Sequence, residues 1–366
     1  MIRLLHAADL HLDSPFQSLT ARQALERRAE QRQLPARIAA LAREKRADIL
    51  VFAGDVFDSD ALFSETGRSI ERALAGLDIP VFFAPGNHDW YSRRSLWSTL
   101  ALDERAHVFT SGQMECVALP DLGARVWGSA FTSRSRRAPL ADFEAEKDGD
   151  LVDIMVLHGD VGQPGSPYGP ITDGQLECSG MDYVALGHSH TFSGLRRAGE
   201  TFYAWPGCAE GRGFDECGEK GVILAEIGPG ECRIEFLPLG GRRYEILKVD
   251  ITDADEPLEA VEAALDGRGR DDVYRIVLTG ETAQAPDMAL LHRALEGRFY
   301  AVQLRDETRP KRALWDGCGE DSLRGLFLTK LRRRYEETTD ERQRRRIAQA
   351  ARWGLRALEN GEELPL

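Results

Sequence analysis

Five short segments of this chain each run an apolar, strand-like stretch directly into a cluster of metal-binding side chains. The clusters are Asp9-Leu-His11, Gly54-Asp55-Val-Phe-Asp58, Gly86-Asn87-His88-Asp89, His158-Gly159 and Gly187-His188-Ser-His190. Buried strands of an α/β sheet present their ligand sites at the carboxyl ends of the strands. The pattern therefore restricts the chain to folds in which five strand ends meet at one edge.

The length of the chain indicates more than one structural unit. With 366 residues, it exceeds the roughly 250 to 300 residues that one hydrophobic core supports. From residue 1 to about 240, strand-like runs alternate with helix-like segments such as 22–45 and 64–77, which predicts an α/β fold. Short extended pieces at 201–205, 221–227 and 233–237 then predict added strands of a second, more antiparallel layer. We expect a two-sheet α/β sandwich.

The pattern restarts after residue 240 and predicts two further parts. Extended stretches at 244–250, 273–280 and 300–304 alternate with helical stretches at 258–265 and 287–295, which predicts a small α+β unit. Residues 321–359 are almost uninterrupted helix formers with two basic clusters, and they predict one or two amphipathic helices. These clusters form either a solvated helical face or a docking surface. We divide the chain into 1–240, 241–312 and 313–366.

Charge and cysteine content limit the partners and the compartment. The net charge of −13 argues against a protein that binds nucleic acid through an overall positive field, so a DNA substrate would need local basic patches, a bound metal or a partner. The six cysteines include no C-x-x-C pair, which favours reduced thiols in the cytoplasm. No apolar run approaches the roughly 18 residues of a membrane span, and the first cluster follows Met1 too closely for a signal peptide. We expect a soluble, cytoplasmic protein without membrane association.

The clusters together predict a site for two metal ions. Two divalent cations about 3.5 to 4 Å apart can generate a hydroxide and clamp both the attacking and the leaving oxygen of a phosphoryl displacement. A carboxylate can bridge them, and Asp55 is the best candidate. One ion would take Asp9, His11 and one histidine of the turn at 188–190, and the other would take Asn87, His158 and the remaining histidine. Alternation along an extended Asp-x-His or His-x-His puts both side chains on one face.

The donor set also indicates the metal and a proton donor. Mixed imidazole, carboxylate and amide ligands suit manganese, with iron or zinc as alternatives, better than magnesium or calcium. His88 stands beside a ligand without being needed as one, so it is free to donate a proton to the leaving oxygen or to stabilise the transition state. Asp58, three residues after Asp55, could orient His88.

These motifs resemble the calcineurin-like metallophosphoesterase superfamily, and all of its expected positions are filled. Within that superfamily, Asp9-Leu-His11, Gly54-Asp55-Val-Phe-Asp58 and Trp205-Pro206-Gly207 resemble the SbcD family of nucleases and its YhaO-like relatives, and the stretch 211–221 looks especially YhaO-like. The resemblance implies an αββα sandwich over residues 1–240, followed by a small α+β capping domain and C-terminal helices. Such nucleases dock onto an SMC-like ATPase through helices in this position.

The resemblance also implies roles for individual residues. One metal would be held by Asp9, His11, Asp55 and His190, and the other by Asp55, Asn87, His158 and His188. His88 would act in catalysis, with Asp58 as its partner. The related archaeal and eukaryotic nucleases carry a histidine where this chain has Asp58, so a DNA-contacting role of that histidine does not carry over.

We therefore predict a metal-dependent DNA exonuclease, with endonuclease activity as an extension, that works with an SMC-like ATPase in DNA end processing and repair. The acidic balance favours a partner that contributes DNA affinity. A phosphoesterase of small molecules or phosphoproteins is an alternative, because one fold serves many substrates. A non-catalytic scaffold that positions DNA ends is another. Pairing of the chain with itself as a homodimer stays open.

Overall fold

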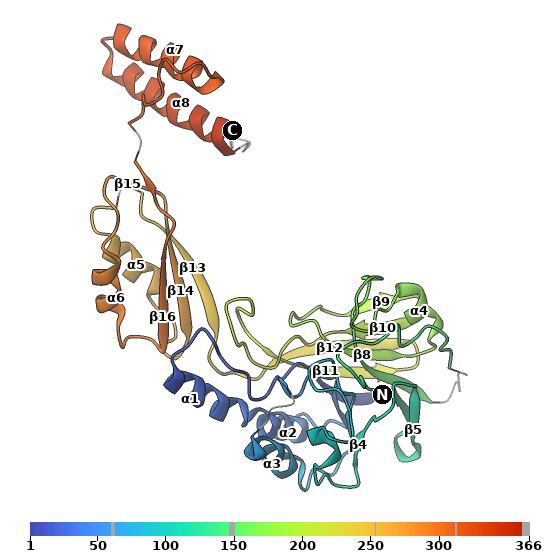
Figure 1. Cartoon of the computed structure of the whole chain (residues 1–366). Coiled ribbons are helices and arrows are strands. Elements are labelled where there is room, and N and C mark those ends of the chain that lie inside the picture. Colours follow the sequence, from blue (N-terminus) through green and yellow to red (C-terminus); the bar gives the residue numbers. More distant parts are fainter. Residues whose placement is uncertain (60–62, 146–150, 253, 312, 361–366) are drawn as a thin grey trace. The chain divides into compact units, whose positions relative to one another are not determined.

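Two structural units make up the chain. This computed structural model describes residues 1–59, 63–145, 151–252, 254–311 and 313–360 (Figure 1). The first unit comprises Met1–Ile246, Gly269–Arg275 and Gly297–Ala301, and the second comprises Leu247–Arg268, Ile276–Glu296 and Val302–Leu366. The domain boundaries predicted at residues 240 and 312 stay predictions, and residue 312 itself lies outside the described residues.

The first sheet of the larger unit has parallel strands at its centre. In spatial order its strands are β12 (Glu231–Pro238), β11 (Gly221–Gly228), β1 (Ile2–Ala7), β2 (Ile49–Phe52), β3 (Val81–Phe83) and β4 (Ala106–Val108). Strands β1 to β4 run parallel, whereas β11 and β12 form an antiparallel hairpin beside β1.

The second sheet of this unit also has parallel strands inside, but it has antiparallel strands at both edges. Its order is β5 (Glu115–Leu119), β6 (Ala124–Gly128), β7 (Val152–His158), β8 (Tyr183–Gly187), β10 (Thr201–Ala204) and β9 (Arg196–Ala198). Strands β6, β7, β8 and β10 are parallel, and β5 and β9 are antiparallel to their neighbours. Two short 3-10 turns, Leu96–Ser98 and Pro120–Leu122, complete the connections.

The predicted place of two strands was wrong. We expected residues 221–227 and 233–237 in the second layer, but β11 and β12 belong to the first sheet, and only β10 joins the second. The reason is the burial of β11 on both faces. Val222 and Leu224 pack into the core on one side of the first sheet, whereas Ile223 and Ala225 pack into the core between the two sheets.

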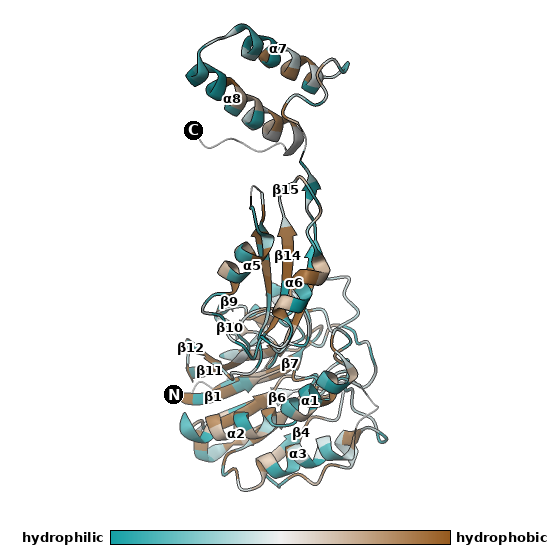
Figure 2. Cartoon of the chain, turned by 90° about the vertical axis from the view of Figure 1, so that its left-hand side faces the viewer, coloured by the Kyte–Doolittle hydropathy of each residue, from teal (hydrophilic) through white to brown (hydrophobic). Residues whose placement is uncertain are grey.

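Helices cover the outer faces of the two sheets, so the layers are α, β, β and α. Leu34 and Ile38 of α2 (Leu34–Glu44) and Ile70 of α3 (Ser64–Leu74) pack on the outer face of the first sheet. Leu176 of α4 (Asp173–Cys178) packs on the outer face of the second. Figure 2 shows β7 as largely apolar, as expected for a strand that is buried on both faces. The predicted two-sheet α/β sandwich is confirmed.

Local sequence signals explain where the helices begin. The stretch predicted as helical at 22–45 forms two helices, α1 (Ala21–Gln31) and α2, because Pro35 fits only the first turn of a new helix. Thr20 caps α1, and Thr172 caps α4. In both helices the glutamine three residues later completes a capping box.

Among the described residues, the second unit contains most of a three-stranded sheet and four helices. Its elements are β13 (Tyr244–Asp250), α5 (Pro257–Leu265), β14 (Val273–Thr279), β15 (Glu281–Thr282), α6 (Met288–Leu295), β16 (Ala301–Asp306), β17 (Arg309–Pro310), α7 (Leu323–Glu337) and α8 (Glu341–Asn360). The sheet order is β13-β14-β16, and β15 pairs with β17. Helices α7 and α8 lie side by side as a hairpin (Figure 1). Within the part of the chain that the structure describes, every helix is too short or too polar to cross a membrane.

Candidate metal centre

The five predicted clusters meet where the parallel strands of the two sheets end. Asp9 and His11 follow β1, Asp55 follows β2, and the segment from Asn87 follows β3 in the first sheet. His158 ends β7 of the second sheet, and the turn at 188–190 follows β8. The facing sheets thus bring three strand ends from one side and two from the other to a single edge.

Four of the predicted ligands stand in tight turns with left-handed backbone. The φ angles are 51° at Asp9, 44° at His11, 48° at Asp55 and 99° at His188. Such angles are unfavourable for residues with a side chain and persist only where the surroundings hold them. Here the turns hold one another, because the Asp9 amide donates to the Gly54 carbonyl at 3.0 Å and the His11 amide donates to the Asp55 carbonyl at 2.9 Å. The doublet Asp9-x-His11 therefore works as a turn and not as an extended strand, contrary to our expectation.

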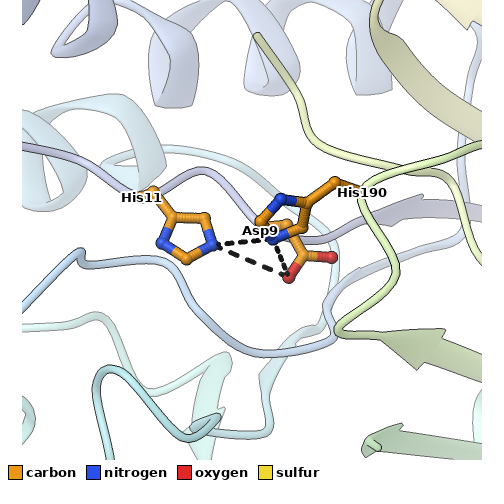
Figure 3. Close-up of side chains that lie close together, drawn as sticks. All are labelled: Asp9, His11 and His190. Carbon is orange, nitrogen blue, oxygen red and sulfur yellow. Dashed lines mark hydrogen bonds and ion pairs between the residues drawn. The ribbon is translucent and has the colours of Figure 1, made fainter. Parts of the chain in front are cut away.

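One half of the centre consists of Asp9, His11 and His190 (Figure 3). The two histidine Nε2 atoms lie 3.2 Å apart. An Asp9 Oδ1 atom lies 3.9 Å from the His11 Nε2 and 3.8 Å from the His190 Nε2. Asp9 and His11 are fully buried, so their ligand atoms have no access to bulk water.

The other half consists of Asn87, His158 and His188, together with Asp55. The His158 Nε2 lies 2.9 Å from the Asn87 Oδ1 and 3.3 Å from the His188 Nδ1. The His188 Nδ1 lies 3.1 Å from the same Asn87 oxygen.

Asp55 lies between the two halves. Its Oδ2 is 3.7 Å from the His11 Nε2 on one side and 3.3 Å from the His158 Nε2 on the other. Its Oδ1 accepts a hydrogen bond from the His88 amide at 2.9 Å, which fixes the direction of the carboxylate. The structure thus brings all seven predicted metal ligands to one centre, with Asp55 between its two halves, where its carboxylate would be placed to contact both ions.

His88 stands at the exposed side of the centre. Its ring packs edge-to-face against His11 with a centroid distance of 4.8 Å, and its Nδ1 lies 2.9 Å from the backbone oxygen of Asp58. The carboxylate of Asp58 instead contacts the His11 Nδ1 at 3.2 Å. Asp58 therefore contacts His88 through its main-chain oxygen, whereas its carboxylate faces His11.

The buried charges in the centre shift one another's pKa values. Burial raises the pKa of Asp9 to about 6 and lowers the pKa of His11 to about 4. Burial opposes ionisation of Asp55 as well, but the charge and hydrogen bond of His158 hold the pKa of Asp55 far below its ordinary value. Burial alone would lower the pKa of His158, yet the carboxylates of Asp55 and Asp9 outweigh it and raise the pKa to about 9.

These contacts fit a pair of divalent cations. The Nδ1–H of His158 donates to the Ala53 carbonyl at 2.9 Å, so in a neutral ring the Nε2 lone pair faces the oxygens of Asn87 and Asp55. Acceptors that face one another need a positive charge between them. The raised pKa of His158 has the same cause, because the neighbouring carboxylates favour a positive charge on the ring. The mixed nitrogen and oxygen donors suit manganese, iron or zinc.

Buried groups behind the ligands hold the strand ends in place. The Asp89 carboxylate accepts hydrogen bonds from the amides of Gly86, Val56 and Phe57, and so joins the turns after β3 and β2. His6 of β1 crosses to the facing sheet. Its Nε2 donates to the Leu186 carbonyl at 3.2 Å, and its Nδ1 lies 3.1 Å from the Tyr183 hydroxyl.

Two residues outside the predicted set also reach the centre. The Glu216 Oε1 lies 2.7 Å from the His190 Nδ1, and the Arg212 guanidinium contacts Glu216 and, at 3.1 Å, Asp58. In the sequence they stand out only as part of the glycine-rich stretch 211–221, and nothing in their spacing indicates a contact with His190.

A cavity of about 640 Å³ adjoins this side of the centre. Its walls include Asp58, Arg212, Phe16, Phe214 and Arg275. The Arg275 guanidinium stacks over the Phe214 ring at 3.9 Å. The cavity thus combines aromatic surface with charged groups beside the predicted metal ligands.

Two facing sheets that gather buried His and Asp side chains at one end define a metal-dependent phosphoesterase. Residues 2–192 match the family model described as "Calcineurin-like phosphoesterase", and the chain belongs to this family.

Individual proteins also resemble the chain. The "Uncharacterized metallophosphoesterase YhaO" of Bacillus subtilis (strain 168) is 29% identical over 344 residues, which cover 86% of this chain and 80% of that protein. Among solved structures, TT1561 of Thermus thermophilus matches with a TM-score of 0.41 and 14% identity, covering 65% of this chain and 99% of that one. A dimetal phosphatase from Danio rerio matches with a TM-score of 0.40 and 12% identity, covering 64% of this chain and 98% of that one.

Proposed function

We propose that this metallophosphoesterase is a DNA exonuclease of the SbcD/YhaO-like type, with endonuclease activity as an extension, that acts in DNA end processing and repair. The observation that carries the proposal is an aromatic and cationic surface beside His88. Trp90 lies two residues after His88, and the Arg134 guanidinium stacks over the Trp90 ring at 5.4 Å. Arg134 is exposed and Trp90 is half-buried. Proteins bind single-stranded nucleic acid with this combination, because the aromatic ring stacks on a base and the cation contacts phosphate.

Each residue of the centre has a task in this reaction. The bound cations would supply Lewis-acid chemistry and an activated nucleophile. His88 is exposed and its Nδ1–H donates to the Asp58 carbonyl, so a ring that carries a second proton presents its Nε2–H outward and can deliver that proton to the leaving sugar oxygen. The buried carboxylates and histidines keep the ligand atoms in place before substrate arrives.

The proposal includes the partner and the compartment. Leu323, Leu326 and Trp353 of the α7–α8 hairpin are exposed, and such side chains support docking of an SMC-like ATPase on these helices. All six cysteines are free thiols, as expected in a reducing cytoplasm. Manganese stays the proposed metal, and pairing of the chain as a homodimer stays a further option for the assembly.

The test compares DNA with small phosphodiesters as substrates. Purified protein with manganese is incubated with end-labelled linear DNA or with bis(p-nitrophenyl) phosphate, beside His88→Ala and Trp90→Ala proteins. We expect His88→Ala to reduce hydrolysis of both substrates and Trp90→Ala to reduce only DNA degradation. Cleavage confined to the small ester would contradict the DNA proposal, unless addition of the ATPase restores DNA degradation.

A phosphoesterase of small molecules or phosphoproteins is the second candidate. The cavity of about 640 Å³ beside the centre has the size of a small-molecule site, and Phe16 and Phe214 give it apolar walls. This candidate predicts that Phe214→Ala weakens hydrolysis of nucleotides or aryl phosphates more than Trp90→Ala does. The scaffold hypothesis predicts instead weak metal binding and an unaltered DNA affinity in an Asn87→Ala or His88→Ala protein.

A further inference from the structure

Two carboxylates stand behind the histidines of one half of the centre. The Asp58 Oδ1 lies 3.2 Å from the Nδ1 of His11, and the Glu216 Oε1 lies 2.7 Å from the Nδ1 of His190. The Nε2 atoms of these two rings face each other in the predicted metal site at 3.2 Å. Each ring thus has a carboxylate at one nitrogen and the predicted metal position at the other.

This arrangement determines where each ring carries its proton. A neutral imidazole has one N–H donor and one acceptor nitrogen, and a carboxylate only accepts hydrogen bonds. The Nδ1 of both histidines must therefore carry the proton, which leaves the Nε2 lone pair for a cation. A carboxylate behind a ligand histidine also fixes the ring plane and strengthens the histidine as a donor.

Arg212 connects the two carboxylates. Its Nη1 donates to the Asp58 Oδ1 at 3.1 Å, its Nη2 donates to the Glu216 Oε1, and its backbone amide donates to the Glu216 Oε2 at 2.8 Å. The Glu216 side chain is only 3% exposed, so its charge depends on Arg212 and His190 for compensation. The Arg212 Nη2 and the His190 Nδ1 lie 3.1 Å apart, although both are hydrogen-bond donors. They lie this close because both donate to the same acceptor, Glu216.

The loop that carries this pair is built against the histidine turn. The Cys208 amide and the Lys220 ammonium both point at the His190 carbonyl, at 3.4 Å. Gly207 has φ of +81°, and a Cβ atom there would lie 3.0 Å from the same carbonyl oxygen. The segment from 207 to 220 therefore packs against the turn that carries His190, and this packing places Glu216 beside the His190 ring.

The other half of the centre has no such pair among the described residues. The His158 Nδ1 donates to a backbone carbonyl, that of Ala53. His188 turns its Nε2 toward Asp160 at 3.5 Å, beyond direct hydrogen-bond reach. Loss of the Arg212 and Glu216 contacts should thus affect one metal ion and spare the other.

We propose that Arg212 and Glu216 are positioning residues for one of the two metal ions. Glu216 holds His190 directly, and Arg212 keeps Glu216 and Asp58 in the geometry that presents His190 and His11 to the cation. The inference rests on metal binding by the centre and is independent of the identity of the phosphoester substrate.

The test measures manganese binding without any substrate. Glu216→Gln and Arg212→Met proteins are compared with wild type, and Glu219→Gln serves as the matched control, because Glu219 lies in the same stretch and is less buried than Glu216. Calorimetric titration with Mn²⁺ gives the affinity of each site, and electron paramagnetic resonance distinguishes a spin-coupled pair of ions from an isolated ion. A carboxylate behind a ligand histidine typically changes metal affinity about 10- to 100-fold.

We expect both variants to bind one Mn²⁺ as tightly as wild type and the second about 10- to 100-fold more weakly, with the coupled signal replaced by that of an isolated ion. Excess Mn²⁺ should restore the coupled signal, which damage to the fold would prevent. Circular dichroism and the melting temperature of the metal-free proteins check folding, and Glu216→Asp provides a second variant if Glu216→Gln is unstable. Two ions bound with wild-type affinity in folded Glu216→Gln and Arg212→Met proteins would overturn the inference. So would an equal loss at both sites.

If these variants bind metal as predicted while wild type fails to degrade DNA, only the proposed function fails.

Discussion

A methyl group added at Gly187 should disrupt the metal centre, because the two sheets leave no space there. Gly187 ends β8, and the Ala53 carbonyl oxygen of the facing sheet lies beside it. A Cβ atom on Gly187 would be 1.8 Å from this oxygen and 2.9 Å from the His158 Nδ1. Contacts of real Cβ atoms are essentially never below 3.0 Å, so the oxygen and the methyl group must separate by at least 3.0 − 1.8 = 1.2 Å.

The structure offers no easy relaxation for the Gly187→Ala protein. The Gly187 carbonyl is held from behind by the Trp205 indole N–H at 3.1 Å and by the Gly159 amide at 3.2 Å. The displacement must then move Ala53, whose carbonyl holds the His158 ring, or β8 itself, which carries His188. Overpacking of this kind costs about 1 to 3 kcal/mol. A shift of about 1 Å in a catalytic group reduces the rate roughly 10²-fold.

Two assays check this prediction against a matched control. We expect the melting temperature of metal-free Gly187→Ala to fall by roughly 2 to 12 °C, since about 1 kcal/mol corresponds to 2 to 4 °C for a unit of this size. Mn²⁺-dependent hydrolysis of bis(p-nitrophenyl) phosphate should fall roughly 10²-fold. Gly174→Ala in α4 is the control, because no atom lies within 4 Å of its Cβ position. Wild-type activity in a folded Gly187→Ala protein would show that the sheets do not approach as described.

Three further predictions address stability and substrate choice. Burial lowers the pKa of His6 from 6.5 to about 3. Between these pH values the unfolded chain binds a proton at His6 that the folded chain excludes. The contribution of His6 to the unfolding free energy is therefore fully present above pH 6.5 and falls by about 1.4 kcal/mol per pH unit toward pH 3. Urea unfolding of metal-free protein at pH 7 to 4 should show this slope in the difference between the unfolding free energies of wild type and His6→Gln, and a difference that does not change with pH would contradict the assignment. Arg27 is fully buried and pairs with buried Glu210 at 3.0 Å, so Arg27→Met should cost about 3 to 5 kcal/mol of unfolding free energy, and Arg27→Met/Glu210→Gln should recover much of it; equal unfolding free energies of the single and double variants would refute this. Trp90→Ala should lower kcat/KM for single-stranded DNA roughly 10-fold through lost stacking, with bis(p-nitrophenyl) phosphate hydrolysis unchanged, and an equal loss on both substrates would instead place Trp90 in the support of the centre.

The grouping of the predicted ligands was predictable in part because it follows from strand order. An apolar strand ends at a short motif, and parallel strands of one sheet end at the same edge, so Asp9 and Asp55 were expected to approach one another. His158 joins them because the second sheet faces the first with its strand ends on the same side. The backbone conformation of each motif could not be predicted in the same way. Asp9 and His11 reach one metal position through left-handed turns, although alternation along a strand also places both on one face. The left-handed turn therefore groups Asp9 and His11 as an extended strand was expected to do.

Side-chain partners between neighbouring turns were beyond the reach of the sequence. The side chain of Asp58 had two histidines within plausible reach, and only the packing of the turn after β2 against the turn after β1 directs its carboxylate to His11 and its carbonyl to His88. The same holds for β11. Its apolar residues fit either sheet, and the decision depends on which edge needs cover, a property of the assembled sandwich.

The metal centre extends beyond the motifs that identify the family. The family match ends at residue 192, just after His190, yet the ring of His190 depends on Glu216 for its orientation. Glu216 and Arg212 lie in the loop that leads to β11, and β11 pairs with β1, whose carboxyl end carries Asp9. Strand β11 therefore contributes twice, because it covers the edge of β1 and anchors the loop that supports His190. A complete pair of metal sites is thus a property of the whole two-sheet sandwich and requires residues well beyond the last motif.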